Sequence, residues 1–321
     1  MTKINELLVS VVIPTYNRTE YFNEALQSVL AQTYKNIEII VVDDNVNKPE
    51  VRRFVEGKVA NIPQCILVQN EKNLGGALNR NEGIKHSSGE LVSFLDDDDT
   101  YEPTRIEKVV EMYKNHDKEE IGVIYTYCYR CDKDMKKVGE YRRKPTSRPL
   151  FQHMCNCLCA TSQWTIPKRV FEKVGMFEQS PSKQDSILLL KILGNGYKVL
   201  CVEESLSNFR SYDGERISRN VENHVKGEKN LLYWQRKYYD QLSVEEQNKA
   251  EISALRRLMY NQASLRRISE SFKLLWKICQ KEKKIYKIAI DTIIVILSPQ
   301  LTKRLFSYAK RCRKKDYTII G

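Results

Sequence analysis

Four consecutive aspartates, at positions 96–99, directly follow the short apolar segment 91–95. Like charges a few ångströms apart repel one another, so the pKa values of such carboxyl groups rise unless a cation neutralises them. Ligands that are all oxygen suit a hard divalent ion, Mg²⁺ or Mn²⁺, which also binds the phosphate groups of a substrate. The alternative is a solvated acidic turn that caps the next helix. The position of the run at the end of a predicted strand favours the metal site.

Strand and helix signals alternate in the part of the chain that contains this run. The β-branched and apolar segments 7–13, 37–42, 65–68 and 91–95 predict buried strands, the first of them stopped by Pro14. Segments 22–30, 48–60 and 77–86 have helical spacing or composition. Because right-handed crossovers connect such units, the alternation predicts an α/β fold with a mostly parallel sheet and helices on both faces. Weaker signals predict strands at 123–128 and 163–166 and helices at 168–174 and 186–193.

Three of the predicted strands are followed by polar residues. These are the segment 14–18, the pair Asp43 and Asp44, and the aspartate run 96–99. In open parallel sheets, ligands bind at the carboxyl ends of the strands. We therefore expect these three segments to meet at one site.

The charge is unevenly distributed over the 321 residues, a length that allows about two domains. Residues 1–215 contain 29 lysines and arginines against 31 acidic residues, whereas residues 216–321 contain 24 against 10. This predicts a first domain at 1–215 and a mainly helical, basic C-terminal region at 216–321. A nucleic-acid-binding body is disfavoured, and a basic module that contacts something anionic is favoured.

The nine cysteines suggest no disulfide framework, and the first residues do not form a signal peptide, so we expect a cytoplasmic protein. No apolar run approaches the ~20 residues that span a bilayer. The apolar segment 285–297 is followed by seven basic residues between 303 and 315. This pattern predicts peripheral attachment to an anionic membrane surface, at the inner face of the cell membrane. The alternative is a helix that packs on the protein and has a solvated basic end.

Five segments together resemble family 2 glycosyltransferases. They are VSVVIPTYNR (9–18), VVDDN (41–45), NLGGALNRNEGIKHSSGE (73–90), FLDDDDTYEP (94–103) and KVGMFEQSPSKQDSILLLKI (173–192). They occur in the family's order and at its usual spacing, within residues 1–215. The resemblance implies a GT-A fold, in which a Rossmann-like nucleotide-binding sheet has helices on both faces. It also implies an inverting enzyme that uses a nucleotide-sugar donor.

The resemblance implies specific roles at the donor site. Pro14 and Tyr16 would lie along the nucleobase and the ribose, and Asp44 would accept a hydrogen bond from a uracil-like imide. Arg80 and the loop 73–76 would approach the diphosphate, since a guanidinium fork matches phosphate oxygens. Arg80 could instead belong to a solvated helix face, and Asp44 to a strand-end turn that caps a helix. The residues implied to bind the nucleotide sugar are Pro14, Thr15, Tyr16, Arg18, Asp43, Asp44, Asn73, Gly75, Arg80, Asp96 and Asp97.

The resemblance also implies a metal ligand and a catalytic base. Asp96 and Asp98 match the family's DxD motif, in which Asp98 would hold Mn²⁺ or Mg²⁺ at the donor phosphates and Asp96 would bind the ribose or the metal shell. Asp185 occupies the position of the base that takes the proton from the acceptor hydroxyl. Its structural alternative is an N-cap.

Some features depart from the family pattern or leave the function open. Asn45 follows Asp44 where the family commonly has glycine, and the QxxRW motif of processive synthases is absent. We therefore expect transfer of one sugar. The resemblance, together with the basic tail, implies a saccharide acceptor that is lipid-linked and belongs to surface-polysaccharide or cell-wall assembly. The alternatives are a nucleotidyltransferase with a similar sheet and a sugar-nucleotide-binding protein without turnover. A nicotinamide-dependent oxidoreductase is disfavoured, because no G-x-G-x-x-G turn follows the first strand.

Overall fold

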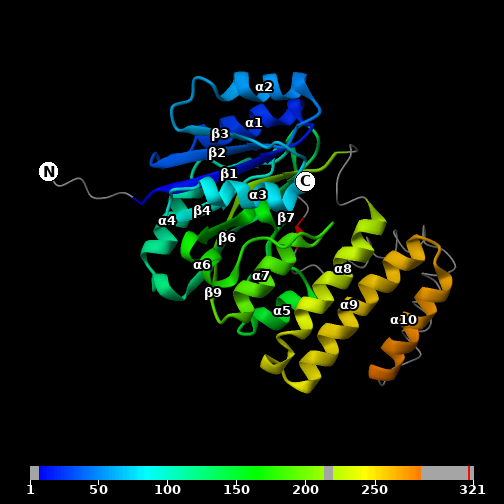
Figure 1. Cartoon of the computed structure of the whole chain (residues 1–321). Helices are drawn as coiled ribbons and strands as arrows, with labels where there is room; N and C mark the ends of the chain where they lie inside the picture. The colour runs from blue at the N-terminus through cyan, green and yellow to red at the C-terminus, as the bar shows by residue number, and fades with distance from the viewer. Residues whose placement is uncertain (1–6, 213–219, 283–316, 319–321) are drawn as a thin grey trace.

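One mixed β-sheet runs through the molecule, with helices on both of its faces (Figure 1). The structure is a computed structural model that describes residues 7–212, 220–282 and 317–318. The strand order along the sheet is β10-β7-β6-β8-β4-β1-β2-β3, and β9 pairs with β5 and β6. The strands are β1 (Val9–Thr15), β2 (Ile37–Asp43), β3 (Cys65–Gln69), β4 (Leu91–Phe94), β5 (Thr100–Tyr101), β6 (Ile121–Cys131), β7 (Lys137–Tyr141), β8 (Trp164–Pro167), β9 (Lys198–Arg210) and β10 (Tyr317–Thr318).

The first four strands form the predicted parallel unit. Val9 of β1 pairs with Ile37 of β2 and with Leu91 of β4, and β2 pairs in parallel with β3. The strands β8, β6 and β7 then continue the sheet in antiparallel fashion. The parallel prediction is therefore confirmed for β1 to β4, and the α/β fold class is confirmed as a whole.

The prediction that Pro14 stops the first strand is wrong, because β1 continues to Thr15. The main-chain oxygen of Val12 accepts a hydrogen bond from the N–H of Leu95. The main-chain groups of the even-numbered residues of β1 therefore point toward β4. The main-chain nitrogen of Pro14 also points to the β4 side, but Pro14 lies beyond Phe94, where β4 ends. No neighbouring strand needs the N–H that proline lacks, so the strand tolerates it.

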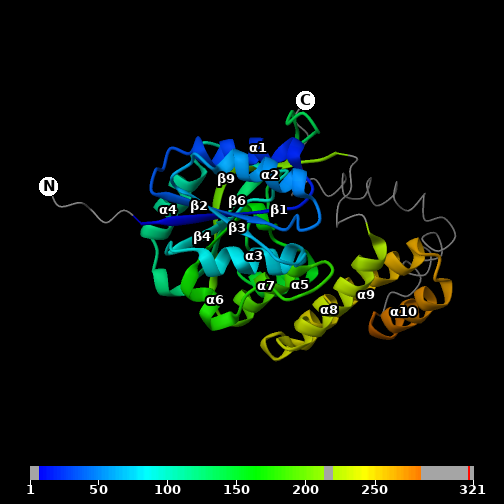
Figure 2. The same ribbon diagram turned by 45° about the horizontal axis from the view of Figure 1, so that its top comes forward.

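Two hydrophobic layers hold helices against the sheet (Figure 2). Alternate residues of a strand point to opposite faces, so Val11 of β1 faces one layer and Val12 the other. The first layer contains α1 (Thr19–Leu30), α2 (Pro49–Val59) and α4 (Arg105–Lys114). The second contains α3 (Gly75–His86), α6 (Lys168–Val174) and α7 (Gln184–Gly194).

Among the described residues, three α-helices follow the last long strand. They lie beside the sheet (Figure 1). They are α8 (Val221–Arg236), α9 (Val244–Ser264) and α10 (Ile268–Lys281), and they share a hydrophobic cluster. A second cluster joins α8 and α9 to α7 and to α5 (Pro149–Cys155), through Ile187 and Leu190 of α7 and Leu231 of α8. The described part of the C-terminal region is thus helical apart from the short strand β10, while the division at residue 215 stays a prediction.

The segment 285–315, from which we predict membrane attachment, lies outside the described residues. Within the ranges that are described, none of the helices has both the length and the apolar character needed to cross a membrane.

Candidate active site

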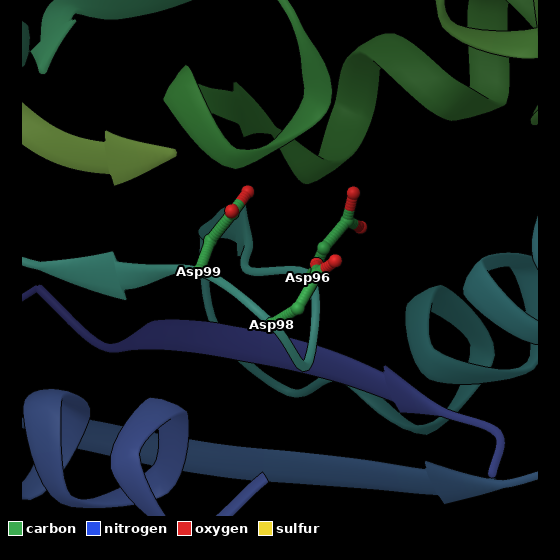
Figure 3. A group of neighbouring side chains, drawn as sticks. All are labelled: Asp96, Asp98 and Asp99. Atoms are coloured by element: carbon green, nitrogen blue, oxygen red, sulfur yellow. The ribbon is translucent and has the colours of Figure 1, made fainter. Parts of the chain in front are cut away.

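The aspartate run forms a tight turn immediately after β4. The main-chain N–H of Asp99 donates to the main-chain oxygen of Asp96 at 3.0 Å, which closes the turn. Because residues 96 and 99 are the ends of this turn, their side chains come together. Asp96, Asp98 and Asp99 each offer one carboxylate oxygen, and these three oxygens lie within 4.8 Å of one another (Figure 3).

This cluster fits a hard divalent cation by its donor chemistry. Asp98 and Asp99 are almost fully buried, and all three ligands are carboxylate oxygens, which Mg²⁺ and Mn²⁺ prefer. Burial, followed by the charges of Asp98 and Asp96, raises the pKa of Asp99 well above its usual range. A bound cation would remove that penalty. The grouping suits the predicted role of Asp98 and adds Asp99, which the sequence interpretation did not single out.

Asp97 belongs to the same run but points to the end of β1. Its carboxylate accepts hydrogen bonds from the Arg18 guanidinium at 2.7 Å and from the main-chain N–H of Tyr16 at 3.2 Å. Burial raises the pKa of Asp97 to about 6, although Arg18 opposes this shift. Arg18 also lies 3.1 Å from Asp98, so one guanidinium balances two carboxylates. Tyr16 is exposed, and Lys48 lies over its ring at 4.7 Å from the centroid.

Asp44 holds the beginning of α3. Its carboxylate accepts hydrogen bonds from the main-chain N–H groups of Leu74 and Gly75, both at 2.9 Å, and from the side-chain amide of Asn70 at 2.9 Å. Gly75 has a φ of 74°, a left-handed conformation that favours glycine. The amide of Asn73 donates to the main-chain oxygen of Asp44 at 3.3 Å. The helix-capping alternative therefore describes Asp44 in this structure, and its predicted contact with a nucleobase stays a prediction.

Asp43 stabilises the turn that follows β2 through hydrogen bonds with a nearby residue of the same turn. It is fully buried, and its carboxylate accepts hydrogen bonds from the main-chain N–H of Asn45 at 2.9 Å and from the Asn45 amide at 2.7 Å. Arg52 lies 3.4 Å from its second oxygen. Pro14 and Thr15 are buried beside this turn, where Thr15 pairs with Asp43 in the sheet.

Arg80 interacts with the aspartate turn and with Asp185, the predicted catalytic base. Its guanidinium lies 2.5 Å from Asp96 and 5.7 Å from the ring centroid of Phe177, and its side chain is largely buried. Burial alone would lower the pKa of Arg80, but Asp96 and then Asp185 and Asp97 hold it above its usual value. The alternative of a solvated helix face is therefore wrong for Arg80. The charges of Asp96 and Asp185 thus both act on Arg80.

Asp185 is the second residue of α7, and it is half-buried. The N-cap of α7 is Lys183, so the N-cap alternative for Asp185 is wrong. One carboxylate oxygen accepts a hydrogen bond from the main-chain N–H of Ser186 at 2.7 Å. The charge of Asp185 acts on Arg80, which itself pairs with Asp96.

Residues that the sequence interpretation missed complete the surroundings of the carboxylates. Arg210, the last residue of β9, donates from Nε to the main-chain oxygen of Asp98 at 3.0 Å and from its main-chain N–H to Asp99 at 3.1 Å. The hydroxyl of Ser162 donates to Asp99 at 2.7 Å, and that of Tyr212 donates to Asp98 at 3.2 Å. Position within the acidic run could have indicated Asp99, but no local pattern marks the other three.

The buried histidine of α5 is a structural neighbour of this site. The N–H of Leu158 donates to Nδ1 of His153, so Nε2 carries the proton and donates to the main-chain oxygen of Ser186 at 2.8 Å. Burial lowers the pKa of His153 to about 4, and the ring is therefore neutral at physiological pH.

Comparisons with known proteins point to one family of enzymes. The family model described as "Glycosyl transferase family 2" matches residues 10–175, just over half of the chain. An uncharacterized glycosyltransferase of Rickettsia prowazekii is 36% identical over 187 residues, which cover 54% of each protein, so the chain matches about half the length of this relative. A glucosyl-dolichyl phosphate glucuronosyltransferase of Haloferax volcanii is 40% identical over 110 residues, which cover 34% of each.

A solved structure gives the same fold at low sequence identity. The crystal structure of residues 1–349 of Staphylococcus aureus TarS in complex with UDP-GlcNAc is 17% identical, covers 92% of both chains and superposes with a TM-score of 0.57. The predicted GT-A fold is thereby confirmed. Taken with the family model and the relatives, these findings show that the chain belongs to glycosyltransferase family 2.

Proposed function

We propose that this protein is a metal-dependent, inverting glycosyltransferase that moves one sugar from a UDP-sugar donor to an acceptor hydroxyl. The observation that carries the proposal is the carboxylate cluster of Asp96, Asp98 and Asp99, beside the cationic side chains of Arg18 and Arg80. Membership of family 2 supports the reaction class. TarS in its complex with UDP-GlcNAc has the same fold, which supports a UDP donor.

The cluster would hold Mn²⁺ or Mg²⁺ through its three carboxylates, and the cation would stabilise the charge of the leaving diphosphate. Arg80 would orient the diphosphate, because its buried guanidinium is already fixed at the edge of the aspartate turn. Arg18 lies 2.7 Å from Asp97 and 3.1 Å from Asp98, so its charge offsets part of the repulsion between these adjacent carboxylates. The exposed ring of Tyr16 would lie along the nucleobase and the ribose.

Asp185 would act as the general base. The acceptor oxygen forms a bond to the anomeric carbon while the bond from that carbon to the diphosphate oxygen breaks, and the hydroxyl proton passes to the Asp185 carboxylate. Attack from the face opposite the leaving group inverts the anomeric configuration. The support for this role is that the charge of Asp185 acts on Arg80, the residue that would orient the diphosphate.

The acceptor in this proposal is a lipid-linked saccharide at an anionic membrane surface, in surface-polysaccharide or cell-wall assembly. The name of the Haloferax relative contains a dolichyl phosphate, which is a lipid carrier. Helix α10 exposes Ile268, Phe272 and Trp276, the last with 67% of its surface accessible. Lys273 and Lys277 line the same surface as Phe272 and Trp276. An exposed apolar face with flanking lysines suits the interface of an anionic bilayer.

A ligand and donor screen tests the proposal. We expect UDP with Mn²⁺ to raise the melting temperature of the full chain, and one UDP-sugar to release UDP only when the metal is present. Stabilisation by a nucleoside triphosphate together with pyrophosphate release would instead identify a nucleotidyltransferase. Binding of UDP without release from any UDP-sugar, even with lipid-linked saccharides present, would identify a binding protein without turnover.

A further inference from the structure

The turn that leads to Asp185 has a conformation that needs support from its surroundings. Lys183 has φ 65° and ψ 17°, the left-handed region, and it directly precedes α7. A non-glycine residue persists in this region only where neighbouring structure determines it. Asp185 lies two residues further on, so the direction of its side chain depends on this turn.

A buried carboxylate of the C-terminal helices holds Lys183. Glu228 of α8 is 1% exposed, and its Oε1 lies 3.0 Å from Nζ of Lys183. Its Oε2 accepts a hydrogen bond from Nε of Arg257 on α9 at 2.9 Å. Arg257 in turn donates to the main-chain oxygen of Cys155 at the end of α5 at 3.0 Å. One carboxylate therefore joins the turn before α7 to α8, α9 and α5.

The neighbouring residue on α8 brings this helix unusually close to the same turn. A Cβ atom on Gly227 would lie 2.1 Å from the Ser182 hydroxyl and 2.7 Å from the Ser182 main-chain oxygen, so only glycine fits without a shift. The Ser182 hydroxyl donates to the main-chain oxygen of Asn223 at 3.0 Å, and Asn230 donates to the Ser180 hydroxyl at 3.1 Å. Four positions on α8 thus contact the segment 180–183.

We propose that Glu228 is a positioning residue that keeps Lys183 in its left-handed conformation and so aims the Asp185 carboxylate at the acceptor hydroxyl. This rests on the proposed function, because it assumes that Asp185 is the base. It deepens that function by assigning a part in turnover to helix α8, which lies beyond the residues 10–175 that the family model matches. Glu228 itself touches none of the three clustered aspartates.

Glu228→Gln tests the proposal, since glutamine keeps the shape of the side chain and removes its charge. We expect the kcat for UDP release from the donor sugar to fall by about 10- to 100-fold, because small misplacements of a catalytic group have effects of this size. The Kd for UDP with Mn²⁺, measured by calorimetry, should stay within about twofold. The matched control is Glu222→Gln on the same helix, which breaks an exposed ion pair with Arg267 at 2.8 Å and should leave kcat unchanged.

A rescue variant separates positioning from general stability. Glycine adopts the left-handed conformation without an ion pair, so Lys183→Gly combined with Glu228→Gln should recover kcat relative to Glu228→Gln alone. If Glu228→Gln does not fold, the comparison of Lys183→Gly with Lys183→Ala serves, and alanine should give the lower kcat. Equal kcat values for these two variants would overturn the proposal.

The failure of this inference differs from the failure of the proposed function. Wild-type kcat in Glu228→Gln, in a protein that loses turnover on Asp185→Asn, would overturn the positioning role and leave the base in place. Wild-type kcat in Asp185→Asn would instead reject the base, and with it the inference that depends on it.

Discussion

Replacement of Asp98 by asparagine separates the metal role of this residue from its structural role. Asparagine keeps the shape of the side chain and an oxygen for the Tyr212 hydroxyl, but it removes one negative charge. In the metal-free protein, the charge of Asp98 helps to raise the pKa values of Asp97 and Asp99, so its removal relieves repulsion. The ion pair with Arg18 at 3.1 Å is lost at the same time. These effects oppose each other, so we expect only a small change in the free energy of unfolding without metal.

The effect on ligand binding is larger. A contact with a charged partner contributes about 1.5–3 kcal/mol, and loss of one such contact raises the Kd of UDP with Mn²⁺ about 10- to 150-fold. At UDP concentrations about 100-fold above the wild-type Kd, binding stabilises the protein by about 2.7 kcal/mol, whereas a 100-fold weaker Kd leaves about 0.4 kcal/mol. For 321 residues at about 2.1 cal/mol/K each, the corresponding shifts in melting temperature are about 4 °C and below about 1 °C.

Thermal unfolding with and without Mn²⁺ and UDP measures both effects in one experiment. The matched control is Asp240→Asn, which changes an exposed aspartate after α8. This variant should retain the full shift in melting temperature on addition of Mn²⁺ and UDP. An Asp98→Asn protein that keeps the full Mn²⁺-dependent shift with UDP would refute the metal role of Asp98.

Three further predictions concern the base, the membrane surface and pH. Asp185→Asn should retain UDP binding with Mn²⁺, but its rate of sugar transfer should fall about 10²- to 10⁴-fold because an amide accepts no proton. Transfer at the wild-type rate would place the base elsewhere. Phe272→Glu combined with Trp276→Glu should reduce co-sedimentation with anionic vesicles at least about tenfold and leave UDP release in solution unchanged, because it puts charge on an exposed apolar face. Undiminished co-sedimentation would exclude α10 as the contact. His153 has a pKa of about 4 in the folded protein and about 6.5 in the unfolded chain. As the pH falls, the unfolded chain therefore binds the proton first. The free energy of unfolding should fall by up to about 3 kcal/mol between about pH 6.5 and pH 4. Urea unfolding of His153→Gln should show a flatter pH dependence, and an identical dependence would contradict the buried neutral ring.

Local sequence patterns predict the parallel half of the sheet well because β1, β2 and β4 are almost entirely buried and their sequences are mostly apolar. The edge strand β3 is only partly buried, but its short apolar run is also visible in the sequence. The rest of the sheet is harder to predict, since its pairing joins distant segments, such as β4 with β8 in antiparallel and β6 with β9 in parallel. Pro14 misled the prediction because the place where β4 ends is a property of the folded sheet.

The candidate site shows the same limit. The aspartate run is visible in the sequence, but the turn that groups Asp96 with Asp98 and Asp99, and turns Asp97 toward Arg18, depends on backbone geometry. Arg210 contacts the turn from more than a hundred residues away, so no spacing rule reveals it. The capping of α3 by Asp44 likewise needs the start of the helix to lie against the end of β2.

The hydrophobic cluster that α5 and α7 share with α8 and α9 bears on how acceptor selectivity can be altered by protein engineering. A chimaera that joins residues 1–215 to the C-terminal half of a different relative exchanges one side of that cluster, together with the partner of Lys183. Such recombinants should lose catalytic efficiency toward every acceptor, including the one that the donated half prefers. Changing the acceptor that this enzyme uses therefore calls for substitutions at solvent-exposed positions, with the cluster shared by α5, α7, α8 and α9 left unchanged.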